Sequence, residues 1–497
     1  MSLRAALLVF ALAPAARAQV NFFARVDGAS EVPPTPSVAI GRAHFMLDLD
    51  TRHLHYRVET NVAGAVSAWI RNAPSGANGP MVFPLTGGPV LWYGISPTLS
   101  DAQLLELHQS ELYVQIATGA FPGGEIRGQI RAQSQRFTSA ALTGAEAGTA
   151  STGTGTGNAH LDVQENVVIA RLTAGGLGAP TTAAHLHVGL LTIPLTPVDA
   201  STWGATTPAL TQAQVDDLLL GNAFFDVHTT AFPGGLGEIR GKVAELAETF
   251  VATCSGTQEL PPNASANTAF GRFSLNPATR QITYSASWTG VGGAGAQMRM
   301  AVPGMAGPVV FPLAGPANGP WAGVSPVLPP ATVAEIWRYG LHLNVPSAAV
   351  PAGEVRGALV QNPNVFGYCG TTAAGILGRR LRITSVGVPT LGNAAFRVGL
   401  GGGDPGAFAS LAWGADRVGT PLLLDFVGAP GHDLWLDPLG GFANAVDAAG
   451  EASMLVPIPP GPPGLVGQDL FFQWFSIEAA ANPAGLVFGD ALRITVQ

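Results

Sequence analysis

The sequence predicts an all-β fold: a tandem array of three β-sandwich modules, each with one short helix, followed by a C-terminal β-sandwich or jelly-roll domain. Three observations support this prediction. One short phrase occurs three times, at a spacing of about one domain length. The chain has 64 glycines and 40 prolines but only 11% charged residues, which is typical of short strands joined by tight turns. Strand-like stretches with alternating apolar residues, such as 53–58 and 281–285, follow one another along the chain.

The repeated phrase contains Gly-Glu-(Ile or Val)-Arg-Gly in each copy. Its glutamates, Glu125, Glu238 and Glu354, lie 113 and 116 residues apart. We therefore assign residues 19–133, 134–245 and 246–362 to three modules and residues 365–497 to a further domain. The motif residues of the three copies are Gly124, Glu125, Arg127, Gly128, Gly237, Glu238, Arg240, Gly241, Gly353, Glu354, Arg356 and Gly357.

The glycine immediately before each glutamate is expected at positive φ, because it is kept in all three copies while the residue before it varies. The glutamate and the arginine are two residues apart on the last strand of the module, so their side chains share a face. We expect them to be exposed and to lock neighbouring strands or join modules, which is a structural role. Recognition of a ligand by the arginine is the alternative.

One short helix per module is expected where capping signals occur. Ser100 with Gln103, and Thr211 with Gln214, have the spacing of capping boxes. In the third module, the pair Pro329-Pro330 stands at the equivalent place, and proline is tolerated in a first helical turn.

Residues 1–18 have the charged start, apolar run and small-residue cleavage site of a secretory signal peptide. The protein is therefore expected to be secreted, at an extracellular, periplasmic or cell-surface location, with no membrane span. The formal net charge of −8 without a basic stripe argues against nucleic acid as a partner. A single lysine, Lys242, among 24 basic side chains suggests a GC-rich bacterial genome.

The two cysteines, Cys254 and Cys369, flank the third module. In an oxidising compartment a disulfide between them would tie the first strand of this module to the linker that follows it. Two unpaired, buried thiols are the alternative.

The modules resemble the chordin-type (CHRD) domain. The resemblance rests on the closing phrase, on Gly307-Pro308-Val309-Val310-Phe311-Pro312-Leu313 in the third copy, and on Ala184-His185-Leu186-His187-Val188-Gly189 in the second. It covers residues 20 to 361. The resemblance implies a secreted β-sandwich module of poorly defined activity. The growth factors bound by animal proteins with such modules are not carried over to this chain.

Histidines set the second module apart from the other two. His185 and His187 face one side of a strand, and His228 with His160 could reach the same place from other strands, forming a copper or zinc site. The arrangement distantly resembles the copper and zinc superoxide dismutase sandwich. Hydrogen bonds from these imidazoles to backbone carbonyls are the alternative, and it is the one we favour from sequence alone. No catalytic residue is assigned, and no cofactor other than this copper or zinc is expected.

The C-terminal domain shows strand patterns at 380–386, 395–400, 408–413, 421–427, 469–477 and 492–496, separated by glycine and proline. Its aromatic residues could form a sugar-stacking face, but their alternation favours core packing. They are Trp413, Trp435, Phe471, Phe472, Trp474 and Phe475.

Together these features predict a non-enzymatic, secreted binding, adhesion or scaffold protein that recognises an unidentified extracellular protein or glycan. We expect its modules to line up as a rod. The alternative is a metal-binding, redox-active protein that uses the histidines of the second module.

Overall fold

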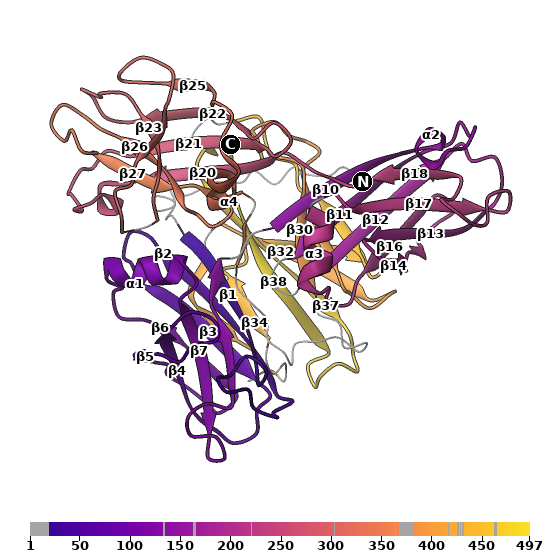
Figure 1. Cartoon of the computed structure of the whole chain (residues 1–497), viewed down its shortest axis with the longest axis horizontal. Coiled ribbons are helices and arrows are strands. Elements are labelled where there is room, and N and C mark those ends of the chain that lie inside the picture. The colour runs from indigo at the N-terminus through magenta and orange to yellow at the C-terminus, as the bar shows by residue number, and fades with distance from the viewer. Residues whose placement is uncertain are drawn as a thin grey trace.

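The computed structural model describes residues 19–132, 135–162, 166–219, 221–302, 304–362, 364–366, 381–415, 417–424, 427, 429, 432–461 and 465–497. The expected signal peptide lies outside the described residues. Within them, antiparallel sheets dominate and the helices are short, which confirms the all-β prediction (Figure 1). No helix in this part of the chain is long and apolar enough to cross a membrane.

The first module is one antiparallel sheet in the order β5-β4-β7-β8-β1-β2-β3-β6. Helix α1 precedes β7, and the short β9 pairs with the start of β1. The elements are β1 (Gln19–Asp27), β2 (Ile40–Asp48), β3 (Leu54–Thr60), β4 (Ala65–Asn72), β5 (Met81–Pro84), β6 (Leu91–Ile95), α1 (Asp101–His108), β7 (Leu112–Thr118), β8 (Ile126–Gln129) and β9 (Arg131–Ala132).

The second module repeats this order as β14-β13-β17-β18-β10-β11-β12-β16, with β15 added at the edge and β19 paired with β10. Its elements are β10 (Gln135–Thr143), α2 (Gly144–Ala147), β11 (Thr154–Asp162), β12 (Val167–Gly175), β13 (Thr181–Val188), β14 (Leu191–Pro194), β15 (Thr196–Pro197), β16 (Thr202–Thr206), α3 (Gln212–Leu219), β17 (Ala223–Thr229), β18 (Ile239–Lys242) and β19 (Ala244–Glu245).

The third module has the same strand order, divided into the sheets β24-β23-β26-β27 and β28-β20-β21-β22-β25. Its elements are β20 (Glu248–Cys254), the 3-10 turn η1 (Gly256–Gln258), β21 (Ala269–Asn276), β22 (Gln281–Trp288), β23 (Gln297–Met300), β24 (Val309–Pro312), β25 (Trp321–Val324), α4 (Pro330–Ile336), β26 (Leu341–Val345), β27 (Val355–Ala358) and β28 (Val360–Gln361).

The closing-phrase arginine joins the two halves of each module. Arg127 pairs with Asp27, Arg240 with Thr143, and Arg356 forms a bridge with Ser255. We call this pairing the seam of the module. The two halves of the sheet on either side of the seam face each other, and their inward side chains form one core in each module. Burying a large apolar side chain in such a core stabilises the fold by about 1.5–3 kcal/mol.

The local signals of the sequence form the expected structures. Ser100 and Gln103 close a capping box at α1, and Thr211 and Gln214 exchange the same pair of bonds at α3. Helix α4 begins at Pro330. The three glycines before the closing glutamates have φ of +132°, +73° and +151°, as expected: they are Gly124, Gly237 and Gly353.

The C-terminal domain contains the sheets β29-β38-β37-β32-β35, β30-β31-β36 and β33-β34. Four of the six aromatic residues singled out above are buried, so this domain uses them as core: Trp435, Phe471, Phe472 and Trp474. The strands are β29 (Asn364–Phe366), β30 (Arg382–Val386), β31 (Arg397–Gly401), β32 (Phe408–Gly414), β33 (Arg417–Leu423), β34 (Asp433–Leu436), β35 (Gly440–Ala445), β36 (Ala452–Leu455), β37 (Asp469–Ile477) and β38 (Leu486–Thr495).

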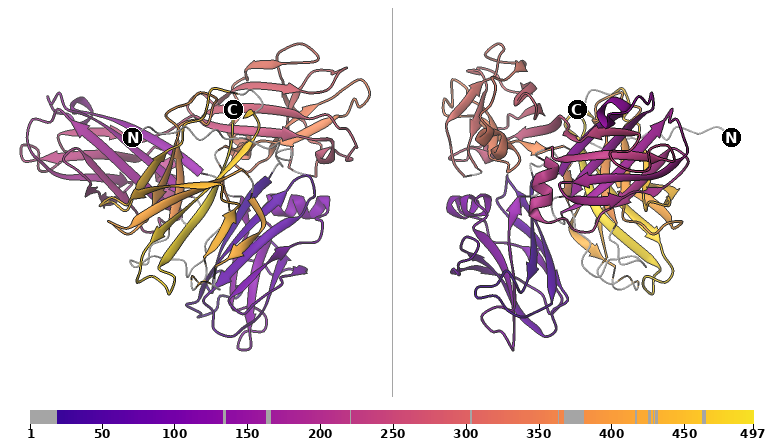
Figure 2. Two further views of the ribbon diagram at one scale, coloured as in Figure 1. Left: turned by 180° about the vertical axis from the view of Figure 1, so that it is seen from behind. Right: turned by 45° about the vertical axis from the view of Figure 1, so that its right-hand side comes forward.

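The modules do not form the expected rod. They splay around the C-terminal domain, which lies between them (Figures 1 and 2). Modules 1 and 3 also contact each other, because His108 Nε2 lies 2.9 Å from Glu335 Oε2. Modules 2 and 3 meet where the Arg136 guanidinium lies 3.6 Å over the Trp337 ring. A rod would require contacts only between successive neighbours.

Modules 1 and 2 dock on the C-terminal domain with the same strand. Arg57 on β3 and Arg171 on β12 are 114 residues apart and occupy the same position in their modules. Arg57 forms ion pairs with Glu59 and with Asp433 of the C-terminal domain, whereas Arg171 pairs with Asp447 and Glu451. The third module is attached at its end, where Asn362 exchanges two hydrogen bonds with the Thr495 backbone.

Among the described residues, Cys254 is a free, completely buried thiol, and the disulfide expected between it and Cys369 stays a prediction. Its Sγ faces the carbonyl oxygen of Leu343 inside the core of the third module, at 3.9 Å. Cys369 lies outside the described residues.

A candidate metal centre in the second module

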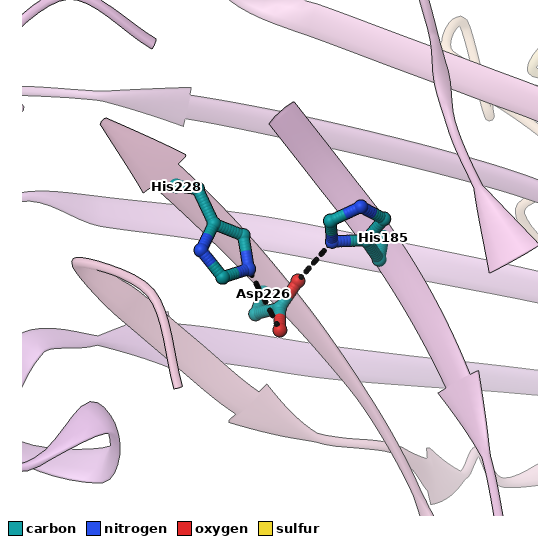
Figure 3. A group of neighbouring side chains, drawn as sticks. All are labelled: His185, Asp226 and His228. Carbon is teal, nitrogen blue, oxygen red and sulfur yellow. Dashed lines mark hydrogen bonds and ion pairs between the residues drawn. The ribbon is translucent and has the colours of Figure 1, made fainter. Parts of the chain in front are cut away.

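His185, Asp226 and His228 converge on the outer face of the second module (Figure 3). Residues of β13 and β17 alternate between the core and this face, so that Leu186 and Val227 are buried while the three polar side chains point outward. His185 lies directly opposite Asp226 in the β13–β17 ladder. The ligand atoms of the three residues all lie within 4.8 Å of one another.

The Asp226 carboxylate is the centre of the group. His185 Nδ1 lies 3.1 Å from its Oδ1, and His228 Nε2 lies 3.3 Å from its Oδ2. His187 also reaches it, with Nε2 at 2.9 Å from Oδ2. The carboxylate is 2% exposed, while the imidazoles are 10–22% exposed, so the acid forms the floor of the site and the rings form its rim.

The ring of His187 is held on two sides. Thr192 Oγ1 lies 3.2 Å from its Nδ1. The ring also stacks on Phe224, with centroids 4.3 Å apart and planes 10° from parallel. Phe224 is in turn covered by the Arg240 guanidinium at 3.6 Å. These contacts direct Nε2 of His187 toward Asp226.

The electrostatics of the site favour an ionised carboxylate. Burial alone would raise the pKa of Asp226, but the hydrogen bond and charge of His187, with the charge of His228 and the bond from His185, outweigh it and lower that pKa. A carboxylate and imidazoles suit zinc or copper as ligands.

The donor atoms of this cluster fit a metal site. Among the described residues, His228 Nδ1 has no hydrogen-bond partner, although it is shielded from solvent. Buried polar atoms are almost always paired in folded proteins, so an unpaired nitrogen beside this cluster is unusual. A bound cation would use the ring nitrogens of His185 and His228 that face Asp226, together with a carboxylate oxygen. The residues of this site therefore fit a transition metal.

His160 does not belong to this group, contrary to our expectation. It lies on β11, three strands away from β17 in the sheet, and it is close enough to the C-terminal domain to feel the charge of Arg382. Burial and the charge of Arg382 lower its pKa to about 3. His160 stands 114 residues after Met46, which shares an apolar cluster with Trp435 of the C-terminal domain. Both residues therefore lie on equivalent strands, β11 and β2, which pair with the docking strands β12 and β3.

Sequence reasoning missed Asp226. The signal was present in the register: Asp226 pairs with Arg240 as Gln115 pairs with Arg127 and Asn344 with Arg356. In the first and third modules these amides donate to buried glutamates, Gln115 to Glu31 and Asn344 to Glu259. Only the second module has an acid at this position, and its own opening glutamate, Glu146, is exposed.

The closing-phrase glutamates are structural hydrogen-bond acceptors. Glu125 accepts bonds from Ser37 and Thr118, and Glu238 accepts them from Ser151 and Thr229. Glu354 accepts them from Ser265 and Asn267. Each glutamate thereby fastens the loop before the second strand of its module to the closing turn.

The arginine of the phrase is buried in the first and third modules and half-buried in the second, whereas we expected it to be exposed. Arg127 is 1% exposed and stacks on Tyr113 at 3.5 Å, and it donates hydrogen bonds to the carbonyl oxygens of Pro74 and Ala77. The loop over residues 73–79 covers it, which sequence alternation could not reveal. This arginine is therefore a packing residue at the seam of the sandwich.

Comparisons with known proteins agree with the repeated architecture. A sequence model described as "CHRD domain" matches residues 22–130, 138–243 and 250–359, which is more than half of the chain. The search of curated proteins gave no match.

Among solved structures, a chain from work titled "Structural insight into host cell surface retention of a 1.5-MDa bacterial ice-binding adhesin" was found, at 13% identity and a TM-score of 0.15. The alignment covers 67% of this chain and 91% of that one. A TM-score this low supports no inference about the fold or function of this chain. The family match stands on its own: the chain belongs to the CHRD domain family, with three copies of the domain.

Proposed function

We propose that this chain is a secreted, non-catalytic binding or scaffold protein. CHRD domains are extracellular-type modules, and this chain carries three of them. The observation that supports the proposal is their common attachment. Arg57 and Arg171 fix equivalent strands of two modules to the C-terminal domain, which leaves the β4–β7 and β13–β17 halves facing outward. Such an arrangement presents the equivalent halves of two modules from a single support, and multivalent presentation strengthens binding to a repetitive target.

Surface binding of the whole protein tests this proposal. Fluorescently labelled full-length protein is applied to a glycan array and to intact bacterial cells, with heat-unfolded protein as the control. We expect saturable retention of the folded protein on one of these surfaces. Retention equal to that of the unfolded control on both surfaces would contradict a binding role.

A second candidate function is metal binding by the second module. It is favoured by the convergence of His185, Asp226 and His228, whose ligand atoms lie within 4.8 Å of one another around the buried Asp226 carboxylate. These side chains would hold a zinc or copper ion through one ring nitrogen of each histidine and a carboxylate oxygen. Because the imidazoles must lose their protons to bind a metal, binding is expected to weaken as the pH falls.

The test of this second function is metal analysis of the whole chain. We expect one equivalent of zinc or copper per wild-type chain after equilibration and dialysis. Asp226→Asn and His228→Ala should lose it. Asp226→Asn should still fold, because the equivalent residue of the third module is Asn344. His53→Ala in the first module is the matched control and should retain the metal. A wild-type chain that retains no metal would exclude this function.

A further inference from the structure

The second module has four side chains that could bind a metal, but only three of them converge on one point. The atoms of His185, Asp226 and His228 converge within 4.8 Å, whereas His187 lies outside this group. His187 nevertheless touches Asp226, at 2.9 Å. A four-ligand structural site and a three-ligand open site both remain compatible with the residue types alone, so the position of His187 decides between them.

The contacts of His187 hold its ring in a position from which it supports the Asp226 carboxylate. Its ring is stacked flat on Phe224, and its Nδ1 lies within hydrogen-bond distance of Thr192 Oγ1. Moving the ring toward His185 and His228 would break both contacts. In its observed position, Nε2 holds Oδ2 of Asp226, as outer residues commonly orient the ligands of metal sites.

The surroundings of the three converging residues leave one side uncovered. Asp226 forms the buried floor at 2% exposure, and the imidazoles of His185 and His228 form a rim that is 22% and 10% exposed. An ion held above the carboxylate would therefore have protein on one side and solvent on the other. Three protein ligands with a solvent-facing fourth position characterise sites that exchange an external ligand.

Building on the metal binding proposed above, we infer that His185, Asp226 and His228 form a three-ligand centre with a fourth position open to an external anionic ligand, and that His187 is a positioning residue. The ligand class is a small anion or a carboxylate presented by an extracellular partner. Such a group would complete the ion's coordination shell and would tie a partner to the second module through the metal. Modules 1 and 3 lack the histidines at these positions and would not share this property.

Cobalt substitution of the full-length protein tests the inference. Co²⁺ can occupy zinc sites, and its visible absorption reports the coordination shell. We expect the cobalt protein to bind azide with saturation, shifting the visible bands while one equivalent of cobalt stays bound. Cobalt bound with a spectrum that azide does not change would show a closed centre, which overturns the inference and leaves the metal-binding function intact. Failure to bind cobalt at all would overturn both.

The His187→Ala variant provides the second measurement. If His187 is a positioning residue, removing its side chain should weaken the affinity for cobalt by about 10–100-fold. The azide-induced shift should be unchanged once cobalt is saturating. If the variant instead gains a response to azide that the wild-type protein lacks, His187 is the fourth ligand and the inference is wrong. His53→Ala, which is remote from the site, should match the wild-type protein in both measurements.

Discussion

At the scale of single residues, one change of charge distinguishes the second module. Gln115 and Asn344 place a neutral amide against the buried glutamates Glu31 and Glu259. Burial raises the pKa of Glu259 to about 7, although the charge of Arg356 opposes this effect. An acid at the amide position would face a second carboxyl group there, and two buried carboxyls repel when both are ionised. In the second module, Glu146 is exposed, so Asp226 ionises and attracts histidines instead.

Glu248 gives a pH-dependent prediction at the same scale. It is buried at the start of β20. Burial raises its pKa to about 8, although hydrogen bonds from Thr249 and Gln361 act to lower the pKa. A raised pKa means that its contribution to stability is complete below its ordinary value of 4.5 and is lost as the pH rises through 8. We expect the free energy of unfolding to fall by up to about 1.4 kcal/mol per pH unit in this window.

The Glu248→Gln variant should lack this slope. Urea unfolding of the wild-type and variant proteins at pH 5, 6, 7 and 8 measures it, with the exposed Glu146→Gln as the control. Parallel pH profiles for Glu248→Gln and the wild-type protein would refute the assignment of the slope to this residue.

At the scale of elements, the closing turn is the part that each module repeats most faithfully. Its glycine has positive φ, and in the first and third modules it lies against the hydrogen-bonded pair of an amide on β7 or β26 and the opening glutamate. A Cβ at Gly353 would lie 2.3 Å from Asn344 Nδ2 and 2.5 Å from Glu259 Oε1. At Gly124 the corresponding distances are 2.3 Å to Gln115 Nε2 and 2.5 Å to Glu31 Oε1. The turn therefore excludes side chains for two reasons, backbone conformation and lack of space.

Gly124→Ala should consequently destabilise the first module by about 1–3 kcal/mol, since it combines strain at positive φ with a steric clash. The adjacent Gly123→Ala is a matched control, because nothing lies within 4 Å of its Cβ position. Thermal unfolding of the two variants beside the wild-type protein measures the difference. Equal stability of the two variants would contradict this account of the turn.

Features determined by neighbours in sequence could be predicted, and features determined by distant segments could not. The capping boxes at Ser100 and Thr211 and the glycine at 353 depend on a few adjacent residues, and they form as expected. The burial of Arg127 depends on a loop more than 45 residues earlier in the chain, and we expected that arginine to be exposed. Alternation was enough to place His185 and His187 on one face of a strand, but Asp226 required knowledge of the strand register.

At the scale of the whole molecule, the C-terminal domain is the common support of the modules. The Arg57, Glu59 and Asp433 group at the first interface is buried, with side chains 1%, 6% and 0% exposed. Removing one partner of a buried ion pair leaves the other charge uncompensated, which typically costs about 3–5 kcal/mol. The retained Glu59 offsets part of this loss, so we expect Asp433→Asn to destabilise the docking of the first module by about 3 kcal/mol.

Hydrogen exchange is the measurement for this prediction. Peptides from β2 and β3 should exchange faster in Asp433→Asn than in the wild-type protein, while peptides from β13 and β17 should be unchanged. Asp101→Asn is the control, because that carboxylate pairs with Arg52 while 57% exposed and contributes about 1 kcal/mol at most. Unchanged exchange in β2 and β3 would contradict the role of this ion pair.

The rod that we expected from the tandem repeat is wrong for a physical reason. Tandem order constrains only which modules are joined by the chain, whereas their packing depends on surface residues that the repeat does not predict. Arg57 and Arg171 stand where the third module has Ser285, so only two of the three modules can form these ion pairs.

The position of β38 has a mechanical consequence. This last strand lies between β29 and β37 and is antiparallel to both. Tension applied to the C-terminus along the strand would shear two ladders of hydrogen bonds at once, and would not open them one by one. Because β29 follows the third module directly, part of the load would pass into that module. A protein held by its C-terminus would therefore resist mechanical unfolding by a flowing liquid.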